Sequence, residues 1–194
     1  MAGSLEEVVA SSLTESADVK RALAENAAGE IAAMARRITD AVVGGGKLLL
    51  CGNGGSAADA QHVAAELVGR FIVERRALPA IALTTDTSVL TSLLNDYGGE
   101  SVFVRQIEAL GNQGDVLLAL STSGESPNVL AAVRTARALG LTTIGLTGER
   151  GGAVARSCDI AIRVPSSSTA RIQEAHITIC HVICDAVERA VAAT

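Results

Sequence analysis

The chain has 194 residues, of which 48% are hydrophobic and 19% charged, a balance typical of one folded globular domain and not of a disordered chain. Its formal net charge of −5 argues against a nucleic-acid partner, which selects clustered Lys and Arg. The sequence has no membrane-length apolar run and no basic–apolar leader at its N-terminus, so we expect a cytoplasmic protein with no membrane partner.

The first 43 residues are expected to form an N-terminal helical arm of two helices. Leu5, Val8, Val9 and Leu13 have helical spacing, a second helical pattern runs from Ala27 to Val42, and the glycines at 44–46 end it. The alanine-rich faces of the arm suit packing either on the domain or on a partner subunit. We predict a single domain over 1–194, with the arm at 1–43 and an α/β core and C-terminal helix at 44–194.

Five short apolar runs alternate with helical patterns after the arm. The expected strands are 47–51, 79–83, 115–120, 142–146 and 160–164, and the expected helices are 57–70, a segment ending at Leu94 before a turn-rich break at 95–99, 102–110, 127–139 and about 170–193. This alternation predicts an α/β fold with a doubly wound, parallel, five-stranded sheet flanked by helices. Ligands of such sheets bind at the carboxyl ends of the strands.

The first strand runs into a glycine-rich loop, Gly52–Asn53–Gly54–Gly55–Ser56. Glycines let a ligand approach the backbone, and the N-terminus of the following helix favours an anion such as phosphate. The run also fits the dinucleotide fingerprint GxGxxG/A, and a plain structural turn is a further alternative. Two features count against a dinucleotide: His62 and Glu66 lie on the following helix, and a second polar loop follows the third strand.

That second loop is rich in hydroxyl groups and precedes a helix that starts at Pro127, with Ser126 as its expected cap. An ordinary capped turn needs one serine, whereas hydroxyls and backbone amides together can hold a phosphate dianion without lysine. The loop therefore favours phosphate binding through Ser121, Thr122, Ser123 and Ser126.

Two pairs of polar residues suggest chemistry on helices. His62 and Glu66 share one helical face at i, i+4, although such an isolated pair is more often a surface contact. On the last helix, Gln173 and His181 project to similar sides, and His181 lies in an apolar run where an unpaired imidazole is costly to bury. We interpret His176 as a satisfied core histidine.

A glutamate and a histidine beside a phosphate site suit an isomerase that moves a proton next to a carbonyl. The same side chains, with a glutamine oxygen, can instead or in addition bind a divalent metal such as zinc. Because glutamine is a poor structural zinc ligand, we expect such a metal to be catalytic or loosely held. The four cysteines at 51, 158, 180 and 184 lack CxxC spacing and are interpreted as free thiols.

The chain resembles the sugar isomerase (SIS) domain family and, within it, the bacterial phosphoheptose isomerases, over essentially its whole length. The resemblance rests on CGNGGSAADAQHVAAEL at 51–67, LLNDYG at 93–98, GDVLLALSTSGESPNV at 114–129, GLTGERGG at 145–152 and RIQEAHITICH at 171–181. It implies a SIS, flavodoxin-like fold with an N-terminal helical arm.

The resemblance also implies an activity. Members of the family convert sedoheptulose 7-phosphate to D-glycero-D-manno-heptose 7-phosphate through an enediol, the first step toward ADP- or GDP-heptose for lipopolysaccharide and other surface glycans. Glu66 would match the family's base and His181 its acid. The substrate contacts implied are Asn53, Gly54, Gly55, Glu66, Asn95, Asp96, Ser121, Thr122, Ser123, Ser126 and Gln173.

Family members can also bind one zinc ion per subunit on residues matching His62, Glu66, Gln173 and His181, and they form homotetramers with active sites at subunit interfaces. One relative is instead a replication-initiator-associating regulator that binds a protein partner without turnover and lacks the residues matching Glu66 and His181. This chain retains both, which favours the isomerase over that regulator. A sugar-phosphate or nucleotide binding module would need neither residue, and the segment 165–168 is a candidate for specificity.

Overall fold

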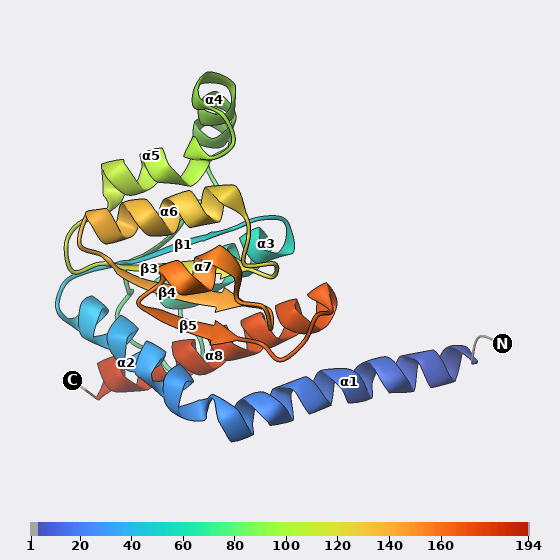
Figure 1. The fold of residues 1–194 in the computed structure, drawn as a ribbon. Coiled ribbons are helices and arrows are strands. Elements are labelled where there is room, and N and C mark those ends of the chain that lie inside the picture. The colour runs from blue at the N-terminus through green and yellow to red at the C-terminus, as the bar shows by residue number, and fades with distance from the viewer. Residues whose placement is uncertain (1–3, 194) are drawn as a thin grey trace.

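The computed structural model describes residues 4–193, so residues 1–3 and 194 of the predicted domain lie outside the described residues. Helices and strands alternate after two N-terminal helices (Figure 1). In chain order the elements are α1 (Leu5–Asn26), α2 (Ala28–Val43), β1 (Leu48–Gly52), α3 (Gly55–Val68), β2 (Ala80–Ala82), α4 (Thr87–Tyr97), α5 (Ser101–Leu110), β3 (Val116–Ser121), α6 (Pro127–Ala138), β4 (Thr142–Thr147), α7 (Gly152–Ser157), β5 (Ile160–Arg163) and α8 (Thr169–Ala192).

The five strands form one parallel sheet in the order β2-β1-β3-β4-β5. This is the flavodoxin-like order, in which the strand sequence reverses next to β1. The predicted α/β fold with a doubly wound five-stranded sheet and an N-terminal helical arm is therefore confirmed. Gly52 of β1 lies opposite Leu120, and Ser121 of β3 lies opposite Thr147 of β4, so both polar loops leave the same edge of the sheet.

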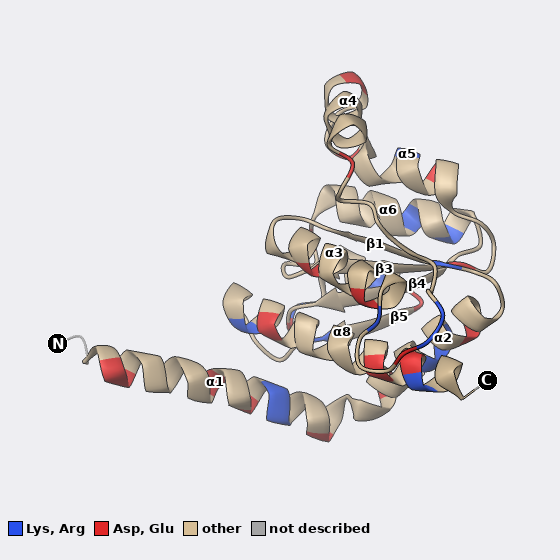
Figure 2. Cartoon of the chain, turned by 180° about the vertical axis from the view of Figure 1, so that it is seen from behind, with Lys and Arg blue, Asp and Glu red and all other residues tan. Residues whose placement is uncertain are grey.

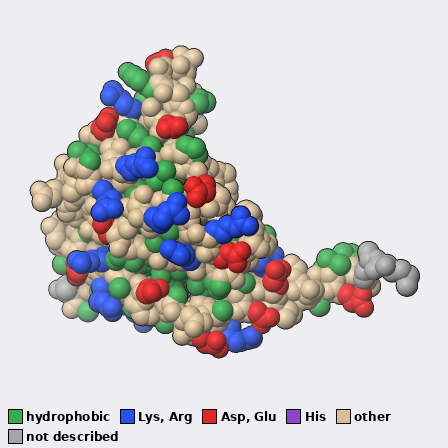
Figure 3. All heavy atoms as spheres, viewed as in Figure 1, with side chains coloured by type: hydrophobic (Ala, Val, Ile, Leu, Met, Phe, Trp, Pro, Cys, Tyr) green, Lys and Arg blue, Asp and Glu red, His purple; other side chains and the backbone are tan. Residues whose placement is uncertain are grey.

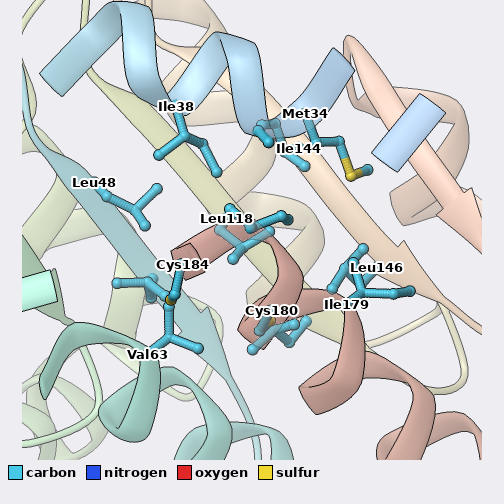
Figure 4. Close-up of a cluster of buried hydrophobic side chains, with 14 of the residues drawn as sticks. Met34, Ile38, Leu48, Val63, Leu118, Ile144, Leu146, Ile179, Cys180 and Cys184 are labelled. Carbon is cyan, nitrogen blue, oxygen red and sulfur yellow. The ribbon is translucent and has the colours of Figure 1, made fainter. Parts of the chain in front are cut away.

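Helices cover both faces of the sheet (Figure 1). The core on one face is formed with α2, α3 and α8, and the core on the other face with α5, α6 and α7. Figure 4 shows the first core, where Ile38 of α2, Val63 of α3 and Ile179 of α8 lie around Leu118 of β3. Each fully buried aliphatic side chain of this kind stabilises the fold by roughly 1.5–3 kcal/mol. The core is almost entirely aliphatic, as the low aromatic content of 2% predicts.

The N-terminal helix α1 extends beyond the domain as a long arm (Figure 1). A capping box between Ser4 and Glu7 starts it, which satisfies backbone donors at its N-terminus. Val19 and Leu23, in its second half, are buried in the core, whereas the apolar side chains of its outer half are exposed: Leu5, Val8, Val9 and Leu13. The charged side chains of α1 are mostly acidic (Figure 2).

Helix α4 stands away from the sheet and packs on α5 (Figure 1). The Asp86 side chain caps it by accepting the Val89 N–H at 3.0 Å. The predicted turn-rich break at 95–99 is wrong in its first part, because the helix continues through Tyr97. It ends at Gly98, whose φ of +84° is left-handed and favours glycine.

A second difference lies between β4 and β5, where the sequence predicted only a glycine-rich connection and the structure has the short helix α7. Gly151 and Gly152 begin it with positive φ values of 69° and 64°. Six residues are too few to show a helical period in the sequence. Of the helices in the described part of the chain, none has the length and apolar character needed to cross a membrane.

Candidate active site

The last helix, α8, packs against the glycine-rich loop that follows β1. Gly54 has a φ of +55°, and α3 begins directly after it at Gly55, two residues earlier than predicted. The Gln173 amide of α8 lies against Gly55, where a Cβ would be 2.3 Å from Gln173 Nε2. A side chain at position 55 would therefore displace the Gln173 amide from this place. Gly54, Gly55 and Gln173, all predicted substrate contacts, are therefore brought together.

Asn53 connects this loop with the second one. Its side-chain amide exchanges two hydrogen bonds with that of Asn128 in the first turn of α6, with N···O distances of 2.9 and 2.8 Å. Asn128 was not among the predicted site residues. The signal for it was its place directly after Pro127, at the end of the hydroxyl-rich loop. The reciprocal pair holds the two loops at a fixed separation at the carboxyl edge of the sheet.

The hydroxyl groups of the second loop partly bond to the loop itself. Ser121 Oγ lies 3.0 Å from Ser126 Oγ and accepts the Gly124 N–H at 3.1 Å. Ser126 does occupy the N-cap position of α6, as predicted. Its side chain makes no capping hydrogen bond, however, so the predicted capping contact is wrong. Ser123 Oγ accepts the Glu125 N–H at 3.2 Å. The loop is therefore preorganised by its own side chains.

A cavity of about 480 Å³ opens beside this loop. It places Thr122 and Ser123 with the hydroxyls of the 165–168 segment and with one basic side chain, Arg150. Its lining residues are Thr122, Ser123, Glu125, Gly148, Glu149, Arg150, Ser166, Ser167, Thr169 and Ile172. Of its two carboxylates, Glu125 accepts the Ala153 N–H. Hydroxyl donors and a guanidinium suit a phosphate group.

The predicted acid and base meet through a third residue. His62 Nε2 lies 2.9 Å from His181 Nε2 and 3.3 Å from Glu66 Oε1, so one imidazole bridges α3 and α8. The ring of Phe71 stacks on His181 with centroids 5.4 Å apart and planes 22° apart. Glu66 and His181 are partly buried, whereas His62 is more exposed. The arrangement can pass a proton between a carboxylate and an imidazole.

Asp59 lies under this cluster and was missed by the sequence interpretation. It is buried, and its Oδ2 has no hydrogen-bond partner. Burial raises the pKa of the carboxyl, while Gln173 and the two nearby histidines act to lower it. Asp59, His62 and Glu66 share one face of α3 at i, i+3 and i+7, and that spacing was the signal available in the sequence.

The donor chemistry of the cluster fits zinc, since His62 and His181 supply imidazoles, Glu66 a carboxylate and Gln173 an amide oxygen. Their arrangement is that of a hydrogen-bonded cluster, with the two imidazole nitrogens 2.9 Å apart. Within residues 4–193, no group of three or more His, Cys, Asp and Glu side chains is placed to hold a metal ion as it stands.

Two predicted substrate contacts lie apart from the others. Asn95 and Asp96 are exposed on α4, where the Asn95 side-chain amide donates to Asp96 Oδ1 at 2.7 Å. Helix α4 stands off from the sheet on the side of α5 (Figure 1). The remaining predicted residues come from the end of β3, from the loops after β1 and β3 and from helices α3 and α8.

The chain is similar to known proteins along most of its length. The family model of the SIS domain matches residues 13–148. A protein of Roseiflexus named phosphoheptose isomerase is 59% identical over 174 residues, which cover 90% of this chain and 88% of that protein. The solved structure of the phosphoheptose isomerase from Neisseria gonorrhoeae matches with a TM-score of 0.91 at 44% identity, and that from Francisella tularensis with 0.93 at 40%; each match covers 96% of this chain and all of the other.

Proposed function

The chain belongs to the SIS-domain family of phosphoheptose isomerases, and we propose that it converts sedoheptulose 7-phosphate to D-glycero-D-manno-heptose 7-phosphate. The observation that supports this most directly is the placement of Glu66 and His181 on two different helices, each next to the imidazole of His62, at 3.3 and 2.9 Å. An aldose–ketose isomerase needs such a base and acid in one place.

In the proposed mechanism, the phosphate binds in the cavity beside Thr122 and Ser123, and Gln173 and the first loop contact the sugar chain. Glu66 removes a proton from C1 of the open-chain ketose while His181 donates a proton to the carbonyl oxygen O2, which gives the enediol. Return of a proton to C2 and loss of the O1 hydroxyl proton then complete the aldose. The isomerisation needs no external oxidant, because C1 is oxidised as C2 is reduced.

The test is turnover of sedoheptulose 7-phosphate by the purified protein and by Glu66→Gln and His181→Gln. Loss of a general acid or base slows such reactions about 10²- to 10⁴-fold, and we expect kcat to fall by that factor in both variants. His176→Gln is the matched control, because His176 is buried and bonds to the Thr147 carbonyl oxygen away from the cluster. Full activity of either test variant would contradict its role. A wild type without turnover would refute the proposed function.

We also propose one zinc ion per subunit, held by His62, Glu66, Gln173 and His181. When bound there, zinc would polarise the substrate carbonyl. The support is the donor chemistry of these four side chains. Elemental analysis after dialysis should find about one equivalent of zinc in the wild type and in His176→Gln, and much less in His62→Gln. Equal zinc in all three proteins would show that these residues are not its ligands.

The assembly proposed is a homotetramer with active sites at subunit interfaces. It is supported by the uncovered apolar side chains of the α1 arm and by the position of Asn95 and Asp96, which a second subunit could bring to the site. The cytoplasmic location and the use of the product for activated heptose and surface glycans stay predictions.

A further inference from the structure

A buried carboxylate on α8 binds the backbone of the segment that connects α3 with β2. The Glu188 side chain is 0% exposed and accepts the backbone N–H groups of Phe71, Ile72 and Val73 at 2.9, 2.6 and 2.7 Å. Burial acts to raise the pKa of this carboxyl, but the three N–H donors and the Arg75 guanidinium outweigh it and lower the pKa. An ionised Glu188 therefore fixes three successive residues of the connection against α8.

Arg75 joins the same carboxylate to α3. Its side chain is 2% exposed, with Nε 3.3 Å from Glu188 Oε1, and its guanidinium donates to the backbone carbonyl oxygens of Glu66, at 2.7 Å, and of Gly69. The Arg75–Glu188 pair thus ties the end of the helix that bears the base to the helix that bears the acid. Stability alone explains such a pair poorly, because well-packed apolar residues often replace a buried ion pair without loss.

The segment that Glu188 holds includes Phe71, whose ring contacts His181, the proposed acid. The Phe71 ring stacks on His181 at a centroid distance of 5.4 Å, while His62 meets His181 edge-on at 5.1 Å with an interplanar angle of 72°. Such contacts restrict ring orientation. His181 is therefore held by a stacked ring on one side and a hydrogen-bonded imidazole on another.

We infer that Arg75, Glu188 and Phe71 are positioning residues of the isomerase, which orient the His181 ring and the Glu66 backbone toward each other. They act through these two residues and do not themselves contact the reacting atoms. This inference rests on the proposed function. A misplacement of about 1 Å can slow a reaction about 10²-fold, so the effect should fall mainly on kcat and change KM little.

The kinetic test compares Phe71→Leu with Phe71→Tyr. The leucine keeps the apolar packing and removes the stacked ring, whereas the tyrosine keeps the ring. We expect kcat to fall about 10- to 100-fold in Phe71→Leu with KM within about twofold of wild type, and Phe71→Tyr to restore at least half of kcat. The matched control is Phe103→Leu, which alters the only other phenylalanine of the chain, buried on the opposite face of the sheet.

A second readout does not depend on turnover. The Cε1–H signal of His181, assigned by its loss in His181→Gln, should shift in Phe71→Leu and in Glu188→Gln, because the ring or its support has changed, and should stay in place in Phe103→Leu. The inference is overturned if Phe71→Leu keeps wild-type kcat, or if the His181 signal does not move in Phe71→Leu. If the wild type has no turnover but the signal moves as expected, the proposed function fails while the positioning of His181 stands.

Discussion

At the scale of single residues, Asp59 is a side chain whose chemistry conflicts with its surroundings. Its carboxyl is buried with one oxygen unpartnered, and burial disfavours its charged form. The raised pKa means that the folded state binds the Asp59 proton more tightly than the unfolded state does. The free energy of unfolding should therefore fall as the pH rises from the ordinary value of 3.8 through the raised one.

Substitution Asp59→Asn should remove this dependence. The amide has nearly the same shape and no charge, so we expect a higher free energy of unfolding at pH 7 and a flatter change between pH 4 and pH 7. Urea unfolding at both pH values measures the effect. The matched control is Asp86→Asn, since Asn caps a helix about as well as Asp and Asp86 is exposed. A variant whose stability falls with pH as steeply as that of the wild type would contradict the assignment.

At the scale of elements, the sequence predicted the sheet because each strand is a short apolar run between polar turns. Strand β3 is buried over its whole length and paired on both sides, and such a strand has a clear pattern. Helix boundaries were less predictable. The side chains of Asn95 and Asp96 favour a turn, yet α4 continues past them, because its end is set by the backbone of Gly98.

In the site, too, features within one element could be predicted from the sequence, whereas contacts between distant elements could not. The spacing of His62 and Glu66 on α3 could be read directly, since it depends on one helix. The contacts of Gln173 with Gly55 and of Asn128 with Asn53 join elements more than 70 residues apart, and no local pattern encodes them. Ser126 shows a further limit: its position as N-cap was predictable, but its hydroxyl lies against Ser121 instead of capping the backbone.

At the scale of the whole molecule, apolar surface lies uncovered along the N-terminal helices. Figure 3 shows hydrophobic side chains toward the outer end of the arm, where Leu5 is 74% and Leu13 67% exposed. A groove of about 330 Å³ between α1, α2 and α8 is lined mainly by apolar side chains, among them Ile31 and Val182. Contiguous apolar surface of this kind marks an interaction site, and the proposed tetramer would cover it.

This proposal predicts the behaviour of a double variant of the arm, Val9→Glu/Leu13→Glu. Both side chains are exposed in the single chain, so the folded subunit should lose little stability, whereas charges buried in an interface are costly. Wild-type protein should sediment at about four times the subunit mass of 19.7 kDa. The double variant should sediment as smaller species and, if a neighbour completes the site, lose most of its activity.

The matched control is Leu139→Glu, which makes the same chemical change at a leucine that is 40% exposed at the end of α6, away from the arm. It should remain tetrameric and active. A monomeric wild type, or a double variant that stays tetrameric, would contradict the role of the arm. If the double variant dissociates but keeps full activity, the role of the arm in assembly stands, and Asn95 and Asp96 of a neighbouring subunit are not needed for the reaction. The arm variants therefore measure the role of the arm in assembly separately from any role of a neighbouring subunit in catalysis.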